Sequence, residues 1–242
     1  MFREYHRWFS PRLGRDMELL EFGHDGDAVI VFPTRQGRFF DYENWGLVGA
    51  LHDSIGRGRL RLFCVDSVDS EAWYCRGLPP WERIARHRTY EQYVLGEVIP
   101  LIRSRNSAAP LVAHGCSIGA YHAVNLAFRH PELFRRVVGL SGRYDLTRPM
   151  GPFVDLLDGY YDQDVYFQTP SHFIPNLTDP DVLDRLRALS ITLAVGEDDP
   201  FCDNARHLSQ ALSDRGVPNQ LAVWRGEAHR AREWCAMVRT YL

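Results

Sequence analysis

The chain has 242 residues, of which 45% are hydrophobic and 24% charged, a composition typical of a globular protein with a sizeable hydrophobic core. Its 28 basic residues, all arginine, and 31 acidic residues leave a formal charge of −3, which excludes a global positive field for nucleic acid or anionic lipid. No apolar run reaches the roughly 18 residues of a membrane span, and the five cysteines lack the paired spacing of a zinc site. We therefore expect a single domain, 1–242, in the cytoplasm, with no nucleic-acid or membrane partner.

Short apolar runs alternate with helical patterns along the chain, which favours a mostly parallel sheet covered by helices on both faces. The interruption at 143–181 is too long for a simple connection and is rich in aromatic residues, so we interpret it as a cap or insertion over one edge of the sheet. The predicted strands are 16–22, 28–32, 60–65, 111–113, 137–140, 191–195 and 220–224.

Four helices are expected from capping and spacing signals. A capping box predicts that the first begins at Thr89. Apolar residues at helical spacing over 120–127 predict a second helix, which should stop before the His-Pro pair that follows. Asp203 or Asn204 would cap a third helix, and the apolar stripe at 234–241 predicts the last.

The sharpest local signal is the G-x-S-x-G sequence at 115–119, which lies directly between a predicted strand and a predicted helix. In that context Ser117 would occupy a strained turn and present its hydroxyl as a nucleophile, while the N–H of Ile118 donates to the oxyanion formed during acyl transfer. The alternative is a tight turn without catalytic meaning. Cys116, at the variable position, is interpreted as a small buried residue.

An acid partner should follow the serine, in a loop at the end of a later strand. Asp199, after the strand at 191–195, is our choice, because the Gly-x-x-Asp spacing lets the chain turn before the side chain points back. Asp198 in the same loop and Asp145 after the preceding strand are the alternative acids. The acids at 197–199 could also serve only to cap the next helix.

The histidine should come last in the chain. His229 follows the strand at 220–224, where a loop-borne imidazole can reach both the serine and the acid, whereas His207 falls within a helical pattern. A second oxyanion donor should come from the loop after the strand at 28–32, with the backbone N–H of Thr34 or Arg35 as the candidate.

Three further histidines, His114, His122 and His130, recur every eight residues. This spacing does not align metal ligands on one face of a helix, so we predict no metal site.

The segments 115–119, 196–200 and 226–234 together resemble the putative esterase family of α/β-hydrolases, the group around esterase D and S-formylglutathione hydrolase. The resemblance covers nearly the whole chain. It implies an α/β-hydrolase fold with an insertion after the sixth strand of that fold, a Ser-His-Asp triad, and no metal or organic cofactor. The expected activity is therefore hydrolysis of small-molecule carboxylic esters or thioesters through an acyl-enzyme intermediate.

The chain departs from the family pattern at two places. In the histidine segment, commonly His-Asp-Trp-x-x-Trp, His229 and Trp234 match in spacing but Arg230 and Ala231 replace the first Asp-Trp pair. Pro33-Thr34 replaces the usual His-Gly of the oxyanion loop. Both departures touch the pocket, so the substrates of the family are not carried over.

The alternative function is a non-catalytic binding or scaffold protein with a hydrolase fold. The insertion would either close the pocket or form a contact in a homodimer.

Overall fold

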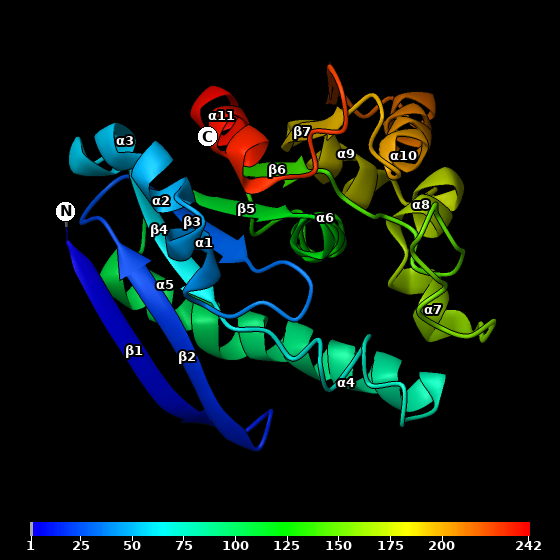
Figure 1. Cartoon of the computed structure of the whole chain (residues 1–242), viewed down its shortest axis with the longest axis horizontal. Helices are drawn as coiled ribbons and strands as arrows, with labels where there is room; N and C mark the ends of the chain where they lie inside the picture. Colours follow the sequence, from blue (N-terminus) through cyan, green and yellow to red (C-terminus); the bar gives the residue numbers. More distant parts are fainter. Residues whose placement is uncertain (1) are drawn as a thin grey trace.

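The computed structural model describes residues 2–242, and an eight-stranded sheet runs through its centre (Figure 1). The strands lie side by side in the order β1-β2-β4-β3-β5-β6-β7-β8. The pairs β1–β2 and β2–β4 are antiparallel and all other neighbours are parallel, which confirms the expected mostly parallel sheet. The strands are β1 (Arg3–Ser10), β2 (Arg15–Phe22), β3 (Asp27–Phe32), β4 (Leu60–Val65), β5 (Leu111–Cys116), β6 (Arg136–Leu140), β7 (Ser190–Gly196) and β8 (Gln220–Trp224).

The central strands are apolar on both faces because helices cover the sheet on both sides. Every residue of β5 is buried, as is every residue of β3 after its first. The edge strand β1 was not predicted from the sequence. Its side chains alternate between exposed and half-buried, so it lacks the continuous apolar run of the inner strands, and it joins the sheet through a hairpin with β2.

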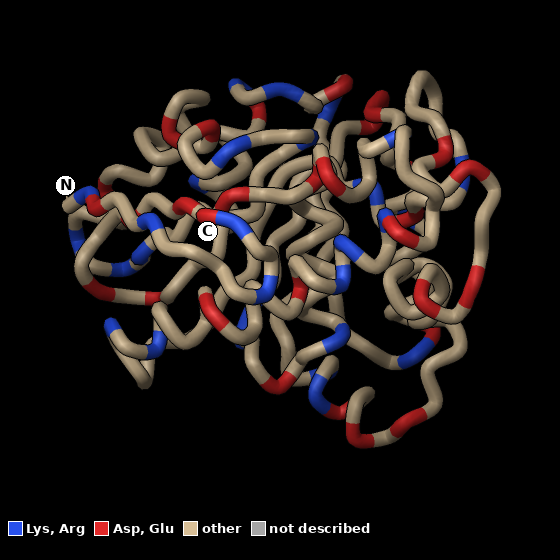
Figure 2. Tube along the Cα trace, turned by 90° about the horizontal axis from the view of Figure 1, so that it is seen from below, with Lys and Arg blue, Asp and Glu red and all other residues tan. Residues whose placement is uncertain are grey.

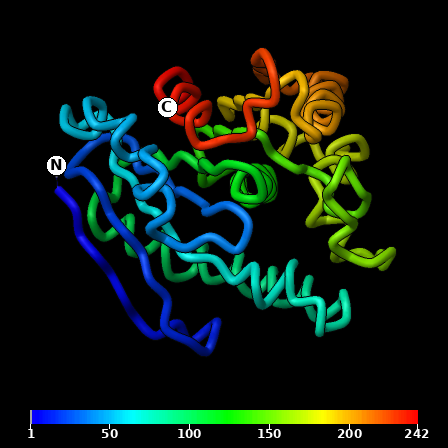
Figure 3. The backbone as a smooth tube through the Cα atoms, in the orientation of Figure 1, coloured from blue at the N-terminus to red at the C-terminus, as the bar shows by residue number. Residues whose placement is uncertain are grey.

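Two helical layers enclose the sheet. The larger layer packs on one face and consists of α4 (Pro80–Tyr93), the π-helical turn η1 (Val94–Val98), α5 (Ile99–Arg105), α6 (Ile118–Arg129), α9 (Pro180–Ala188) and α10 (Cys202–Asp214). The other face is covered by α1 (Asp41–Asn44), α2 (Leu47–Ala50), α3 (His52–Gly56) and α11 (Ala231–Tyr241). Figure 3 shows α11 at the C-terminal end of the chain beside the short helices, where Cys235 lies against the carbonyl of Trp45.

Two predicted helix starts were wrong. The helix expected at Thr89 begins instead at Pro80, and the Thr89 hydroxyl donates to the carbonyl of Ala85 inside that helix. Proline is well suited to the first helical position because the N–H it lacks would have no partner there. The helix expected from Asp203 or Asn204 begins at Cys202, so neither side chain caps it. The ends of the helices around 120–127 and 234–241 agree with the prediction.

The segment 143–181 follows β6, the sixth strand, and carries the short helices α7 (Gln163–Phe167) and α8 (Pro170–Phe173) and the 3₁₀ turn η2 (Ile174–Asn176). Figure 1 shows α7 and α8 below α10, at the end of the molecule opposite the hairpin. Its aromatic residues have different surroundings: Phe173 is 8% exposed and belongs to the main core, whereas Phe167 is 45% exposed. Tyr160 packs against a separate apolar cluster that includes Leu156 and Val165 of the same segment.

The surface charge is mixed. In the view of Figure 2, arginines and acidic residues are interspersed along the chain. Within residues 2–242, no helix is long and apolar enough to cross a membrane.

Candidate active site

Ser117 lies on the turn between β5 and α6, with φ of 56° and ψ of −123°. A positive φ is strained for any residue with a Cβ, so this backbone is held in place by its surroundings. Gly115 and Gly119 make the turn possible. A Cβ at Gly115 would overlap the backbone of Gly119, and one at Gly119 would overlap the carbonyl oxygens of Phe32 and Pro33. The two glycines thus let the turn, the helix and the end of β3 approach closely.

The structure brings Ser117, His229 and Asp199 into one hydrogen-bonded chain. The Oγ atom of Ser117 lies 3.2 Å from Nε2 of His229, and Nδ1 of the same imidazole lies 2.9 Å from Oδ2 of Asp199. The three residues follow β5, β8 and β7, whose carboxyl ends meet at one edge of the sheet. The Asp199 side chain is fully buried and that of His229 is 16% exposed, so the histidine is open to the surface while the acid is not.

The three candidate acids have different surroundings. Asp199 alone contacts His229, and its second oxygen accepts the N–H of Phe201 at 2.9 Å. Asp198 is exposed at the surface of the same loop. Asp145 is buried elsewhere, next to His172 and Arg148. Burial alone would raise the pKa of Asp145, but hydrogen bonds from His172 and Thr147 lower it to about 2.

Aromatic rings surround His229 on several sides. The ring centroids of Trp234 and Phe201 lie 5.2 and 5.5 Å from that of the imidazole, and Phe153 of the insertion lies 6.4 Å away. The indole N–H of Trp234 donates to Ser141 Oγ at 3.1 Å. The five-residue spacing between His229 and Trp234 places Trp234 in the first turn of α11, where its indole packs beside the imidazole.

Ser141 and Phe201 were not predicted as site residues. Ser141 has a φ of 50° directly after β6, and its N–H donates to the carbonyl of Ala194 in β7. Nothing in the local sequence marks it. Its position at the carboxyl end of a parallel strand is the only signal that could have found it.

The candidate oxyanion donors lie around the same turn. Within residues 2–242, the backbone N–H groups of Ile118, Thr34 and Arg35 have no hydrogen-bond acceptor. Ile118 is the first residue of α6, so the positive end of the helix dipole also points toward the serine. Free N–H donors at a helix start are suited to receive an oxyanion.

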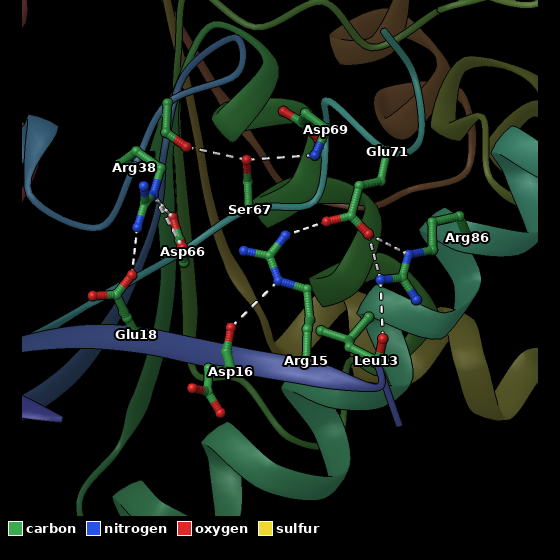
Figure 4. A network of polar contacts seen from close by, with 11 residues as sticks. Leu13, Arg15, Asp16, Glu18, Arg38, Asp66, Ser67, Asp69, Glu71 and Arg86 are labelled. Atoms are coloured by element: carbon green, nitrogen blue, oxygen red, sulfur yellow. Dashed lines mark hydrogen bonds and ion pairs between the residues drawn. The ribbon is translucent and has the colours of Figure 1, made fainter. Parts of the chain in front are cut away.

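A polar network fixes the loop that carries Thr34 and Arg35 (Figure 4). Ser67 Oγ donates to the carbonyl of Gly37 at 3.1 Å. The guanidinium of Arg38 lies 2.9 Å from Asp66 and also contacts Glu18 of β2. These contacts tie the loop after β3 to the strands β2 and β4, which holds its backbone donors in position.

The three evenly spaced histidines do not converge. His114 lies inside β5, between Val138 and Tyr42; His122 pairs with Asp69, and His130 with Glu91. Within the described residues, a group that could hold a metal is formed by Glu4, His6 and Glu21, and this group is far from the triad in the fold, on the β1–β2 hairpin. Arg61 and Arg105 hydrogen-bond to its carboxylates, which disfavours a cation there.

The sheet order, the strand–turn–helix at Ser117 and the solved structures that resemble this one define an α/β-hydrolase fold. A ferulic acid esterase superposes with a TM-score of 0.77 at 16% identity, covering 99% of this chain and 95% of that one. An S-formylglutathione hydrolase from Agrobacterium tumefaciens gives 0.72 at 12% identity, with 98% and 92% covered. The S-formylglutathione hydrolase from Staphylococcus aureus gives 0.69 at 15%, with 99% and 94% covered.

The chain belongs to the Putative esterase family, whose model matches residues 80–236. The expected family and fold are thereby confirmed. No protein with curated annotation matches the sequence.

Proposed function

We propose that the protein is a serine hydrolase that cleaves small-molecule carboxylic esters or thioesters. The observation that carries this proposal is the position of the His229 imidazole, 3.2 Å from Ser117 Oγ and 2.9 Å from Asp199. Membership of an esterase family supports the same reaction class. The chemistry needs no metal or organic cofactor, since the three side chains supply nucleophile, base and orienting charge.

The first half of the reaction forms an acyl-enzyme. Asp199 accepts a hydrogen bond from the Nδ1–H group of His229, which holds the tautomer whose Nε2 is unprotonated. Nε2 can then take the proton of the Ser117 hydroxyl as the serine oxygen attacks the ester carbonyl. The backbone N–H of Ile118, with that of Thr34 or Arg35, donates to the oxyanion of the tetrahedral intermediate. His229 then returns the proton to the leaving alcohol or thiol.

The second half repeats these steps with water. His229 removes a proton from a water molecule, the hydroxide attacks the acyl carbon, and the proton returns to Ser117 as the carboxylic acid leaves. Aromatic rings cover part of the imidazole, whose side chain remains 16% exposed, so water can reach it for this step.

A fluorophosphonate probe tests the proposal directly, because it reacts covalently with an activated serine. We expect rapid, stoichiometric labelling, located at Ser117 by mass spectrometry of the digested protein, and no labelling of Ser117→Ala. Absence of labelling in the folded wild-type protein would contradict the proposal and favour a non-catalytic binding or scaffold role.

A further inference from the structure

A cavity of about 310 Å³ lies beside the triad and is lined by three arginines. Arg35 comes from the loop after β3, Arg76 from the segment between β4 and α4, and Arg143 from the start of the insertion. The lining includes no acidic side chain. A cavity of this size accommodates a small organic group.

The cavity lies next to the candidate triad, because residues of two of its walls also pack against the site. Phe153, which lines it, has its ring centroid 6.4 Å from that of His229. Leu156 and Tyr74, also in the lining, pack in the apolar cluster that contains Ile118, the residue next to the nucleophile. The walls of this cavity and the surroundings of Ser117 and His229 are therefore built from the same residues.

Two of the three guanidinium groups have no carboxylate partner within residues 2–242. Arg143 is 4% exposed, and its hydrogen bonds all go to backbone carbonyls, from Nε to Asp145 and from Nη2 to Arg148 and Val154. Among residues 2–242, no atom accepts a hydrogen bond from its Nη1 group. The Arg35 side chain forms no hydrogen bond or ion pair with residues 2–242. Its guanidinium lies over the Tyr74 ring, 4.8 Å from the ring centroid. Arg76 differs, because it pairs with Asp158 at 2.5 Å.

A buried guanidinium without a counter-ion is unfavourable, because burial removes the water that would otherwise solvate its charge. Burial lowers the pKa of Arg143, and the charges of Asp145 and Asp155, which lie near it without pairing with it, offset this effect only in part. The group stays charged at neutral pH. A carboxylate in the cavity would supply the missing acceptor and counter-charge in the paired geometry that arginine favours.

We propose that this cavity binds a carboxylate carried by the ester substrate, so that the enzyme prefers anionic esters over neutral ones. This inference rests on the proposed esterase function and specifies its substrate class. Arg35 and Arg143 would contact the carboxylate, and the insertion would supply the wall formed by Phe153 and Leu156. Neither guanidinium takes part in the chemical steps. Arg35 is a candidate donor to the oxyanion only through its backbone N–H, which substitutions of its side chain retain.

Matched ester pairs test the proposal. The mono-4-nitrophenyl ester of adipic acid is compared with its neutral adipamate, which places the charge on the acyl side. The acetate ester of 3-hydroxybenzoate is compared with that of 3-hydroxybenzamide, which places it on the leaving group. At low ionic strength we expect kcat/KM to favour the anionic member of at least one pair on the order of tenfold, the effect of one charged hydrogen bond. The pair that responds identifies the side of the substrate that enters the cavity.

Variants assign the preference to the arginines. The readout is the ratio of kcat/KM between the anionic and neutral esters, which cancels any general loss of activity. Arg143→Gln should reduce the ratio, and Arg35→Glu should invert it. Arg35→Lys should retain part of it. Arg206→Gln, which removes one positive charge on α10 outside the cavity, should leave the ratio unchanged. A ratio near one in the wild type, or a ratio insensitive to Arg35→Glu, would overturn the inference while leaving the esterase function intact.

A binding measurement separates the two proposals. In Ser117→Ala, calorimetry compares monomethyl adipate with its neutral amide, methyl adipamate, without any turnover. Tighter binding of the carboxylate supports the cavity assignment even if no ester is hydrolysed and the phosphonate fails to react. Equal binding of the two, together with normal phosphonate labelling of the wild type, would overturn the cavity assignment alone.

Discussion

The carboxylate of Asp199 is shared between His229 and the start of α10: one oxygen lies 2.9 Å from the imidazole Nδ1, and the other accepts the N–H of Phe201 at 2.9 Å. The second bond fixes the carboxylate before any substrate arrives. Because α10 begins one residue after Phe201, the helix itself positions the acid. The following predictions test this arrangement and the surroundings that support it.

Removal of the nucleophile should abolish turnover without unfolding the protein. Ser117→Ala should lower kcat for short-chain nitrophenyl esters by on the order of 10³-fold or more, as triad deletions do. Alanine keeps the Cβ and adds no bulk, so circular dichroism and the thermal midpoint should stay close to those of the wild type. If the variant retained its activity, the nucleophile would have to be reassigned.

Exchange of the acid for its amide should identify the residue that orients His229. Asp199→Asn keeps the shape but favours the wrong imidazole tautomer, with an expected loss of up to about 10⁴ in kcat. Asp198→Asn and Asp145→Asn serve as matched controls, because neither side chain contacts His229. A larger loss in either control would move the assignment to that residue.

The pH dependence of kcat/KM should follow the protonation of one base. Activity should rise with pH, because only the neutral imidazole of His229 can accept the proton of Ser117. The acid limb should fit a single ionisation, and a chelator should leave the rate unchanged throughout. Loss of activity with EDTA, restored by added zinc, would replace the serine mechanism with a metal-dependent one.

The stability of the fold should decrease when the pH is lowered below the pKa of an unfolded histidine. Burial lowers the pKa of His114 to about 4, whereas an unfolded histidine titrates near about 6.5. Between these values the unfolded chain binds a proton that the folded chain excludes, so the free energy of unfolding decreases as pH falls, by up to about 1.4 kcal/mol per pH unit. Above about 6.5 this contribution is complete.

The variant His114→Gln isolates that contribution. Urea unfolding at a series of pH values between 4 and 7 should give a shallower slope for the variant than for the wild type, whatever its absolute stability. If the free energy of unfolding depended equally on pH in the variant and in the wild type, His114 would be able to take up a proton in the folded state.

A methyl group at Gly119 should disrupt the turn that holds the nucleophile. In Gly119→Ala the new Cβ would overlap the backbone carbonyls of Phe32 and Pro33, which cannot move without shifting β3. We expect a loss of about 1–3 kcal/mol in the free energy of unfolding, together with reduced activity. Gly49→Ala in α2 is the control: a Cβ there meets no atom within 4 Å, so its stability should be unchanged or slightly higher. Equal stability of the two variants would contradict the close approach at Gly119.

The positions of Ser117, Asp199 and His229 could be anticipated from the sequence because each follows a buried strand and their chain order is restricted. The inner strands could also be predicted from the sequence, because strands that are buried on both faces consist of continuous apolar residues. The edge strand β1 was not, because its alternating residues resemble those of many exposed segments. Whether the three residues act as a catalytic triad stays a prediction.

Tertiary contacts account for the errors in helix starts. Asn204 was expected to cap a helix, but its Oδ1 accepts the backbone N–H groups of Tyr144 and Asp145, 2.5 and 3.2 Å away. A side chain with a partner sixty residues away in the chain leaves no local signal. The same holds for the arginine-lined cavity, whose three guanidinium groups come from three distant segments.

The 112 residues that separate Ser117 from His229 determine when the site can exist during protein synthesis. At roughly 5–20 residues per second, the serine and its turn emerge from the ribosome several seconds before the histidine. After β6 has emerged and until β7 follows, β6 lacks the neighbour that it has in the finished sheet. An unpaired strand edge of this kind is a template for pairing with another chain. The appearance of phosphonate reactivity during translation would mark the moment at which β7 and β8 have joined the sheet and His229 has reached Ser117.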